Sequence, residues 1–323
     1  MVKVLTWNVN TDMRAEAGGG EYEKFSWNNR KDSVVDTIVK SDADVVCLQE
    51  MREESISDLI GSSSLRERYN FDYAKTNGTG PAFYLAILHR KELLTCVEKQ
   101  VYWMGDGGCV QHFDSCSGSN GFGRIVLQVA LKATPYPDPK WSRTSEVGEQ
   151  MNRLSFRVFC THFGLGEKER LTEARVLGEL VRGKSPCIVC GDFNSFPDAN
   201  GGLQMHTICK EGNLANAAEY GAQIQTLSGV SIVGTQIPYA YDNMFKEKER
   251  VPFKKGAQGG RLDHILYSPD MFTPNGSAKL LTYKIGGGIA EAELLGHNPD
   301  LTVPPVFPSD HLPLIFELDF TNN

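Results

Sequence analysis

Short apolar runs recur along the chain, and each one is seven to nine residues long. Runs of this length that are bounded by turn-forming residues predict buried β-strands rather than helices. The predicted strands are residues 3–9, 43–49, 83–89, 124–132, 155–163, 186–192, 262–268 and 312–320.

Two further segments carry apolar residues at the spacing of one helix face. They are residues 29–40, where Val34 and Ile38 stand four apart, and residues 167–182, where Leu177 and Val181 do the same. Gly183 follows the second segment and predicts the end of that helix. Long loops rich in Gly, Pro and polar residues separate the elements, but none has the character of an interdomain linker. We therefore expect one α/β domain that spans residues 1–323.

Composition places the chain among ordinary globular proteins, since 41% of its 323 residues are hydrophobic and 23% are charged. No apolar run is long enough to span a membrane. The first residues lack the pattern of a signal peptide, so we expect an intracellular protein of the cytoplasm or nucleus. The sequence does not define an oligomeric state, and a monomer is the default expectation. The net charge of −7 means that any anionic ligand requires a local basic cluster or a divalent cation.

The eight cysteines do not suggest a disulfide framework in a chain of this length. Cys187 and Cys190 have C-x-x-C spacing, but residues three apart on a strand point to opposite faces, so we interpret both as core residues. Cys109, His112 and Cys116 form the only cysteine group in a predicted loop. That group could close a small disulfide or bind a metal.

Polar residues occur where six of the predicted strands begin or end, and together they suggest a site. The residues are Asn8, Asn10, Glu50, His162, Asp192, Asn194, Asp263, Asp310 and His311. Several carboxylates at one end of a core would repel one another unless a cation neutralised them. Carboxylates such as those of Glu50 and Asp310 suit a hard cation such as Mg²⁺, with Mn²⁺ as an alternative. No His and Cys arrangement resembles a closed zinc site.

Six motifs in this order make the chain resemble the endonuclease/exonuclease/phosphatase superfamily, typified by deoxyribonuclease I. They are "TWNVN", "LQE", "THF", "GDFN", "RLDHI" and "SDH", and they span residues 6–311. The resemblance implies an α/β fold of four layers, in which two mixed β-sheets pack together between outer helices. It also implies a metal-dependent phosphoester hydrolase whose active site lies on the rim where the strand ends meet.

The same resemblance implies roles for individual residues. Glu50 takes the position of the principal metal carboxylate, Asn8 supports it, and Asp310 is a second metal contact. Asp192 would orient or deprotonate the attacking water, and Asn194 would contact the phosphate. Asp263 and His311 would form a carboxylate–imidazole pair, and His162 would donate to a non-bridging phosphate oxygen. Asn10 stands where some relatives have Asp, and we assign it to substrate binding.

One feature of deoxyribonuclease I is missing. That enzyme supports its first catalytic histidine with a glutamate on a middle strand, whereas the corresponding stretch here, residues 80–90, contains no acid. His162 therefore needs another partner or acts as a neutral donor. His89 and His264 are interpreted as packed, structural histidines.

The substrate class is the open question, because this fold and site serve many phosphoesters. Residues 246–255 hold five basic residues against two acidic ones, and we assign Lys254 and Lys255 to substrate binding. Basic residues interleaved with aromatic ones suit single-stranded nucleic acid, although a solvated charged loop fits as well. We expect a nuclease acting on DNA or RNA. The alternatives are a phosphatase or phosphodiesterase acting on a small or lipid phosphoester, and a binding module without catalysis. The intact set of polar residues argues against the last of these.

Overall fold

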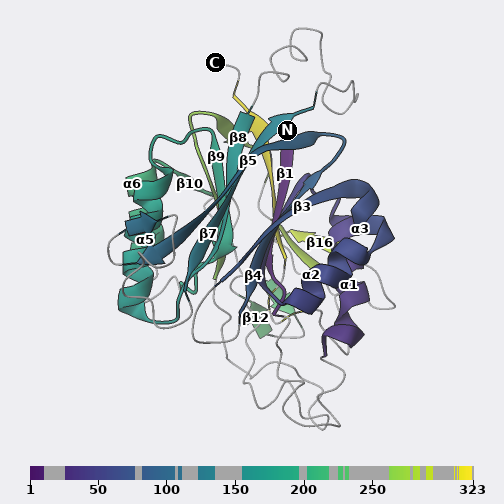
Figure 1. Cartoon of the computed structure of the whole chain (residues 1–323). Helices are drawn as coiled ribbons and strands as arrows, with labels where there is room; N and C mark the ends of the chain where they lie inside the picture. Colours follow the sequence, from purple (N-terminus) through teal and green to yellow (C-terminus); the bar gives the residue numbers. More distant parts are fainter. Residues whose placement is uncertain are drawn as a thin grey trace.

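The computed structural model describes residues 1–10, 26–76, 82–105, 108–110, 123–134, 155–195, 202–217, 225–227, 230–232, 262–276, 279–283, 289–293, 309, 311 and 313–321. Within these residues two large β-sheets pack face to face, and helices cover the outer face of each (Figure 1). No helix in this part of the chain is long and apolar enough to cross a membrane.

The first sheet places β1 near its centre. Its order is β16 (Ile289–Glu293), β15 (Lys279–Tyr283), β17 (Leu314–Phe320), β1 (Val2–Asn8), β2 (Val45–Met51), β4 (Tyr84–Arg90) and β3 (Tyr69–Lys75), and β14 (Phe272–Pro274) also pairs with β17. β1 and β2 run parallel, while β17 runs antiparallel to β1.

The second sheet is built on the same plan around β9. Its order is β10 (Ala215–Asn216), β13 (Asp263–Tyr267), β9 (Cys187–Asp192), β8 (Ser155–His162), β7 (Ile125–Ala133), β5 (Leu94–Gly105) and β6 (Gly108–Val110). β8 and β9 run parallel, and β13 runs antiparallel to β9. A separate hairpin joins β11 (Gln225–Leu227) to β12 (Val230–Ile232).

Three apolar clusters hold the layers together. The cluster between the sheets includes Val4, Ile87 and Cys190. A second one packs α1 (Trp27–Ser41), α2 (Glu53–Gly61) and α3 (Ser63–Arg68) on the first sheet. The third packs α5 (Glu167–Val181) and α6 (Gly202–Gly212) on the second sheet and contains Cys187. These layers confirm the four-layer α/β sandwich expected from the sequence.

The faces of β9 also confirm how its cysteines were interpreted. Cys190 lies between the two sheets, whereas Cys187 lies beneath the helices on the opposite face. Both thiols are free. The thiol of Cys109 is half-buried and lies 3.9 Å from the carbonyl of Val176, while His112 and Cys116 lie outside the described residues.

All eight predicted strands and both predicted helices are present, with ends that shift by one or two residues. The second helix ends before Gly183, which has a φ of 70°. Sequence patterns did not predict β3, β5 and the helices α2, α3 and α6, because polar residues interrupt these elements. β5, for example, reads "LTCVEKQVYWMG" and contains a bulge between Cys96 and Glu98.

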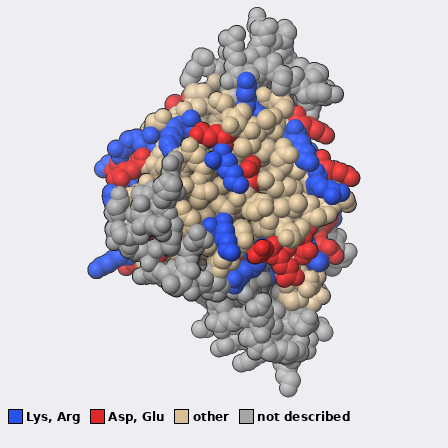
Figure 2. Space-filling view, viewed as in Figure 1, with Lys and Arg blue, Asp and Glu red and all other residues tan. Residues whose placement is uncertain are grey.

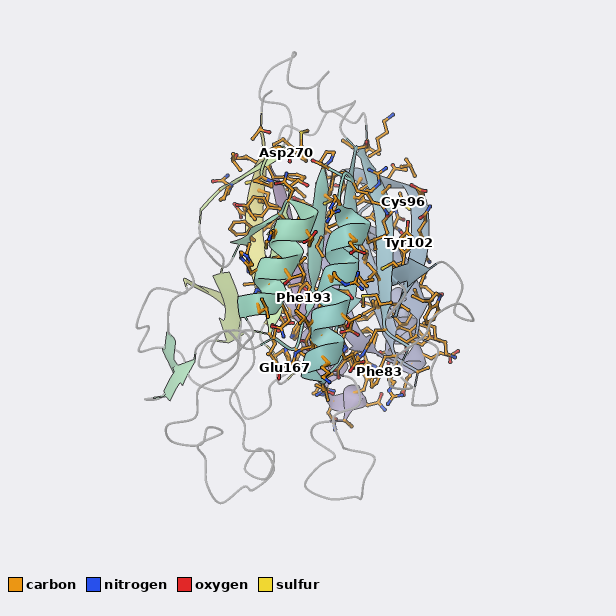
Figure 3. All side chains as sticks on the ribbon, turned by 90° about the vertical axis from the view of Figure 1, so that its left-hand side faces the viewer. Phe83, Cys96, Tyr102, Glu167, Phe193 and Asp270 are labelled. Atoms are coloured by element: carbon orange, nitrogen blue, oxygen red, sulfur yellow. The ribbon has the colours of Figure 1, made fainter. Side chains whose placement is uncertain are left out.

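Strand directions explain why the polar residues meet at one rim. β1, β2, β8 and β9 all end there, and each presents its C-terminal residues. β13 and β17 run antiparallel to β9 and β1, so they begin at the same rim. Figure 3 shows Phe83, Glu167 and Phe193 at this end of the molecule, with Cys96 and Asp270 at the other end. Six strand termini are thereby brought together from distant parts of the chain.

Candidate active site

Asn8 connects the two sheets at the rim. Its side-chain amide donates hydrogen bonds to Oε1 of Glu50 at 2.9 Å and to Oδ2 of Asp192 at 2.8 Å. Asn8 and Glu50 belong to the first sheet, whereas Asp192 ends β9 of the second sheet. One amide therefore holds two carboxylates that would otherwise repel each other.

Three residues of this rim adopt a left-handed backbone conformation, which is uncommon for residues other than glycine. The φ angles are 38° at Asn10, 55° at Glu50 and 48° at Asn194. Glu50 lies in an irregularity of the β2–β4 ladder between Leu48 and Met51. Such a bulge redirects a side chain that regular alternation would place elsewhere. Conformations of this kind cluster at functional sites, where the surrounding structure holds them.

Asp192 and Asn194 stand two apart in the sequence, a spacing that would put both side chains on one face of an extended strand, but the chain turns directly after β9. β9 ends at Asp192, and the left-handed Asn194 folds back so that its backbone N–H donates to Oδ1 of Asp192 at 2.8 Å. The Asn194 and Asp192 side chains still share one site, but a tight turn rather than strand alternation brings them together. Phe193 is buried and packs edge-to-face on Phe163, with ring centroids 4.9 Å apart.

The Asn194 amide is held by two acceptors. Its Nδ2 donates to the carbonyl of Phe163 at 2.8 Å and lies 3.1 Å from Nε2 of His162. Because Nδ2 is a donor, Nε2 of His162 accepts in this arrangement, and the proton of the neutral ring resides on Nδ1. The sequence predicted that His162 donates to a phosphate oxygen. For this, Nε2 would have to carry a proton, and its contact with Nδ2 of Asn194 would have to break.

The surroundings of His162 favour the neutral form of its ring. Burial, reinforced by the positive charge of Arg124, lowers the pKa of His162 to about 3. A pocket next to the ring is lined by Phe83, Leu85 and Ile125, together with Glu50, Arg124 and Thr76. The strand that carries an acid in deoxyribonuclease I thus presents apolar side chains to His162, as the sequence of residues 80–90 indicated.

His311 and Asp263 form a buried pair. Nδ1 of His311 lies 2.7 Å from Oδ2 of Asp263, and the two side chains are 5% and 0% exposed. Asp263 faces Asp192 directly in the β9–β13 ladder. The other ring nitrogen of His311, Nε2, points toward the carboxylate of Asp192 and lies 3.8 Å from its Oδ2. The carboxylate of Asp263 therefore fixes the orientation of a ring whose other nitrogen faces the centre of the site.

Residues that the sequence did not single out support this arrangement. The buried Arg30 donates to the carbonyls of Val9 and Asn10, at 3.1 and 2.8 Å. Ser309 donates to the carbonyl of Asn8 at 2.6 Å and accepts from the backbone N–H of His311 at 3.2 Å. Ser309 was visible inside the "SDH" motif, whereas nothing in the sequence distinguished Arg30 from the other residues of its helix.

The structure brings together most of the residues that were predicted to form the site. Asn8, Glu50, His162, Asp192, Asn194, Asp263 and His311 form one connected group. Asn10 lies at its edge and donates from its backbone N–H to Oδ1 of Asn8 at 3.0 Å. Asp310, Lys254 and Lys255 lie outside the described residues. His264 is separate from this group, because its ring packs on Phe193 and contacts Asn216.

Two overlapping sets of side chains could hold a metal ion. Ligand atoms of Glu50, His162 and Asp192 lie within 4.8 Å of one another, and so do those of Asp192, Asp263 and His311. The first set is more accessible, because Glu50 is 21% exposed whereas Asp263 is fully buried. Neighbouring carboxylate oxygens at an accessible rim fit a hard divalent cation. The donor set therefore agrees with the metal implied by the sequence motifs.

Comparisons with known proteins agree with this geometry. A model of the Endonuclease/Exonuclease/phosphatase family matches residues 5–311. Nocturnin of Drosophila melanogaster is 22% identical over 205 residues, which are 61% of this chain but only 29% of that protein. The chain thus spans less than a third of the length of this curated relative.

Solved structures share the fold at low sequence identity. The mannosyl-6-phosphatase Bt3783 of Bacteroides thetaiotaomicron has a TM-score of 0.62 and 20% identity, and the comparison covers 99% of this chain and 100% of that one. The D. rerio TDP2 structure complexed with single strand DNA product has a TM-score of 0.57 and 13% identity, with 98% of both chains covered. Since the family match extends over nearly the whole sequence, the chain belongs to the Endonuclease/Exonuclease/phosphatase family of phosphoester hydrolases.

Proposed function

We propose that this chain is a divalent-metal-dependent phosphodiesterase that hydrolyses nucleic acid by in-line attack of water on phosphorus. The observation that carries the proposal is the position of one atom, Oδ2 of Asp192. It accepts from Asn8 at 2.8 Å and lies 3.7 Å from Nε2 of His162 and 3.8 Å from Nε2 of His311. A carboxylate at the centre of such a group is placed to take a proton from an attacking water.

In this proposal Glu50, Asn8 and Asp310 hold the cation. A bound Mg²⁺ or Mn²⁺ would act as a Lewis acid that neutralises charge on the phosphate oxygens. The chain contributes the orientation of the carboxylates, since Asn8 ties Glu50 to Asp192. The left-handed conformation of Glu50 directs its carboxylate toward the site, and this conformation strains the backbone.

The remaining residues act on the substrate. Asp192 orients and deprotonates the water, and the hydrogen bond from the Asn194 N–H keeps its carboxylate in place. The Asp263 carboxylate favours the protonated form of His311, which can stabilise negative charge on the phosphate or on the leaving oxygen. Asn194 and His162 contact the phosphate oxygens, and this requires the substrate to separate Nδ2 of Asn194 from Nε2 of His162 and Nε2 to carry a proton. Fixed donors of this kind typically contribute a factor of about 10²–10³ to the rate.

Nucleic acid is the proposed substrate on two grounds. The similar TDP2 structure was determined with a single strand DNA product. Lys254 and Lys255 lie in a basic segment interleaved with aromatic residues, which suits a single strand, and their contribution stays a prediction. On the face seen in Figure 2, basic and acidic side chains alternate, and neither forms a continuous surface. On this face, phosphate binding would therefore depend on individual basic side chains rather than on a broad basic surface.

A phosphatase acting on a small phosphoester is the second candidate. Its support is the similarity to the mannosyl-6-phosphatase Bt3783, which extends over the full length of both chains. The pocket beside Glu50 and His162 also contains Arg124, whose guanidinium could receive a phosphate group. The same site thus fits either a polymer or a small phosphoester, and lipid phosphoesters belong to this second class.

A substrate panel distinguishes the two candidates. The full chain, with Mg²⁺ present, is incubated with labelled single- and double-stranded DNA and RNA, and in parallel with sugar phosphates and phosphoinositides. Strand cleavage that is lost in Asp192→Asn supports the nuclease. Release of inorganic phosphate from a small molecule without strand cleavage supports the phosphatase instead.

A further inference from the structure

The peptide group between Phe163 and Gly164, directly after His162, is held on both of its sides. Its carbonyl accepts from Nδ2 of Asn194 at 2.8 Å. Its N–H donates to Oε2 of Glu173 at 2.9 Å. Asn194 belongs to the proposed site, but Glu173 lies in the second turn of α5 and touches none of the residues assigned to catalysis.

Glu173 is an unusual residue to find at this position. Its side chain is on the buried face of α5, and the residue is only 5% exposed. A buried carboxyl group costs free energy unless hydrogen bonds compensate for its lost hydration. Burial raises the pKa of Glu173 to about 8, while the Gly164 N–H and the nearby Arg124 act against that rise. An apolar residue would be the simpler choice for this helix face, so the carboxyl group requires another explanation.

The surroundings of Gly164 show that the turn is closely fitted to α5. A Cβ at residue 164 would overlap the carboxylate of Glu169, which occupies that space. Phe163 continues the strand ladder, because its backbone N–H donates to the carbonyl of Asp192 at 2.9 Å. The turn is thus held by β9 on one side and by Glu173 of α5 on the other, and the carboxylate of Glu169 lies next to Gly164.

The neighbours of the His162 ring lie on the side of Nε2, which is 3.6 Å from Oε1 of Glu50 and 3.7 Å from Oδ2 of Asp192. Residues 80–90 hold no acid that could support the ring, and Phe83 and Leu85 of this stretch contribute apolar side chains to the adjoining pocket. Arg124 reaches the carbonyl of His162 at 3.5 Å, a long contact. The ring contacts Asn194 through Nε2, and its backbone ends strand β8, where His162 pairs with Asp192 of β9. The peptide group that follows Phe163 therefore decides how the end of this strand is held.

We infer that Glu173 is a positioning residue for His162: with Asn194 it clamps the Phe163–Gly164 peptide and so fixes the backbone behind the catalytic imidazole. This role rests on the proposed function, in which His162 contacts the phosphate. The support comes from α5 rather than from the middle strand of the first sheet. Since displacement of a catalytic group by about 1 Å can cost about 10²-fold in rate, a clamp of this kind is sufficient to matter.

The kinetic test uses Glu173→Leu, Glu173→Gln and the control Glu179→Gln. Leucine has a similar size but cannot accept the Gly164 N–H, so we expect kcat to fall by about 10²-fold with little change in KM. Glutamine retains an acceptor and should keep kcat within about threefold of the wild type. Glu179 is an exposed residue of the same helix, paired with Arg175, and its substitution should have no effect.

A double-mutant cycle with His162→Ala separates positioning from general stability. If Glu173 acts through His162, Glu173→Leu should change kcat by less than about twofold once His162 is removed. An equal loss in both backgrounds would show a purely structural role and would overturn the inference.

A measurement without substrate keeps the inference testable if the chain cleaves none of the phosphoesters or if Glu173→Leu does not fold. In wild-type protein and in Glu173→Gln, the Gly164 amide should be protected from hydrogen exchange. The His162 ring resonances should shift in Glu173→Leu, where it folds, but not in Glu179→Gln. A rapidly exchanging Gly164 amide in the wild type would contradict the clamp. Protection combined with an inactive wild type would instead count against the proposed function.

Discussion

Asn8 donates to Oδ2 of Asp192 at 2.8 Å although the two residues stand 184 positions apart in the chain. This hydrogen bond crosses from the end of β1 in one sheet to the end of β9 in the other. The same amide also holds Glu50 at 2.9 Å. The proposed active site is therefore a junction between the two sheets, and its geometry depends on how they pack.

Metal binding should be visible without any substrate. Mg²⁺ should raise the melting temperature of the wild type, because a ligand that binds only the folded state stabilises it. Glu50→Gln removes the principal carboxylate and should abolish most of that rise. Thermal unfolding with EDTA and with increasing Mg²⁺ measures the effect, and hydrolysis should stop in EDTA and return with Mg²⁺ or Mn²⁺. Full activity in the chelator would contradict the metal site.

Asp192→Asn should lower kcat by about 10³-fold, because an amide cannot accept the proton of the attacking water. The amide oxygen can still accept from one of the two donors that bind the carboxylate, Nδ2 of Asn8 or the N–H of Asn194, and the side chain keeps its size, so the fold should remain intact. Steady-state kinetics together with the circular dichroism spectrum checks both statements. A nearly wild-type rate would remove Asp192 from the proposed role.

The Asp263–His311 pair should behave as one unit. We expect Asp263→Asn and His311→Ala each to lower kcat by about 10²–10³-fold, and the double variant to be little worse than His311→Ala alone. The reason is that Asp263 acts only through the ring it orients at 2.7 Å. Independent, multiplicative losses would show that Asp263 has a separate function.

The left-handed conformation of Glu50 should affect stability in a way that is separate from catalysis. Both Glu50→Gly and Glu50→Ala remove the carboxylate and should be inactive. At a φ of 55°, glycine is free of the steric conflict that alanine meets, so Glu50→Gly should be more stable than Glu50→Ala by about 1 kcal/mol. Chemical denaturation of the two variants measures the difference. If Glu50→Ala were as stable as Glu50→Gly or more stable, the backbone at residue 50 would not be strained by a side chain, which would contradict the prediction.

Glu173 should make the stability of the fold depend on pH. Its pKa of about 8 in the folded state lies above the ordinary value of 4.5, so the folded state retains a proton that the unfolded state releases. The resulting stabilisation is complete below about pH 4.5 and is lost as pH rises through 8. Glu173→Gln lacks this loss, and its advantage over the wild type should grow between pH 5 and 8. Denaturant unfolding at both pH values tests this, and parallel pH profiles for the two proteins would contradict it.

The sequence alone determined the main strands, the helices α1 and α5, and the residue types at the strand ends. These follow from local physics, because alternation and helical spacing record which face each element buries. Cys187 and Cys190, three apart on a strand, were predicted to face opposite ways and do so. Elements with mixed polar patterns, such as β3 and β5, carried no such signal.

Only the tertiary structure decided how the site is assembled. Asp192 and Asn194 meet because Asn194 turns back in a left-handed conformation, not because a strand continues. Asp263 faces Asp192 because β13 pairs antiparallel with β9. His311 lies near the end of β1 because the strand that follows it, β17, pairs antiparallel with β1. Arg30 and Glu173 support the site through contacts with backbone groups, which leave no mark on residue type or spacing. Such contacts depend on packing between distant segments, and local sequence patterns do not encode them.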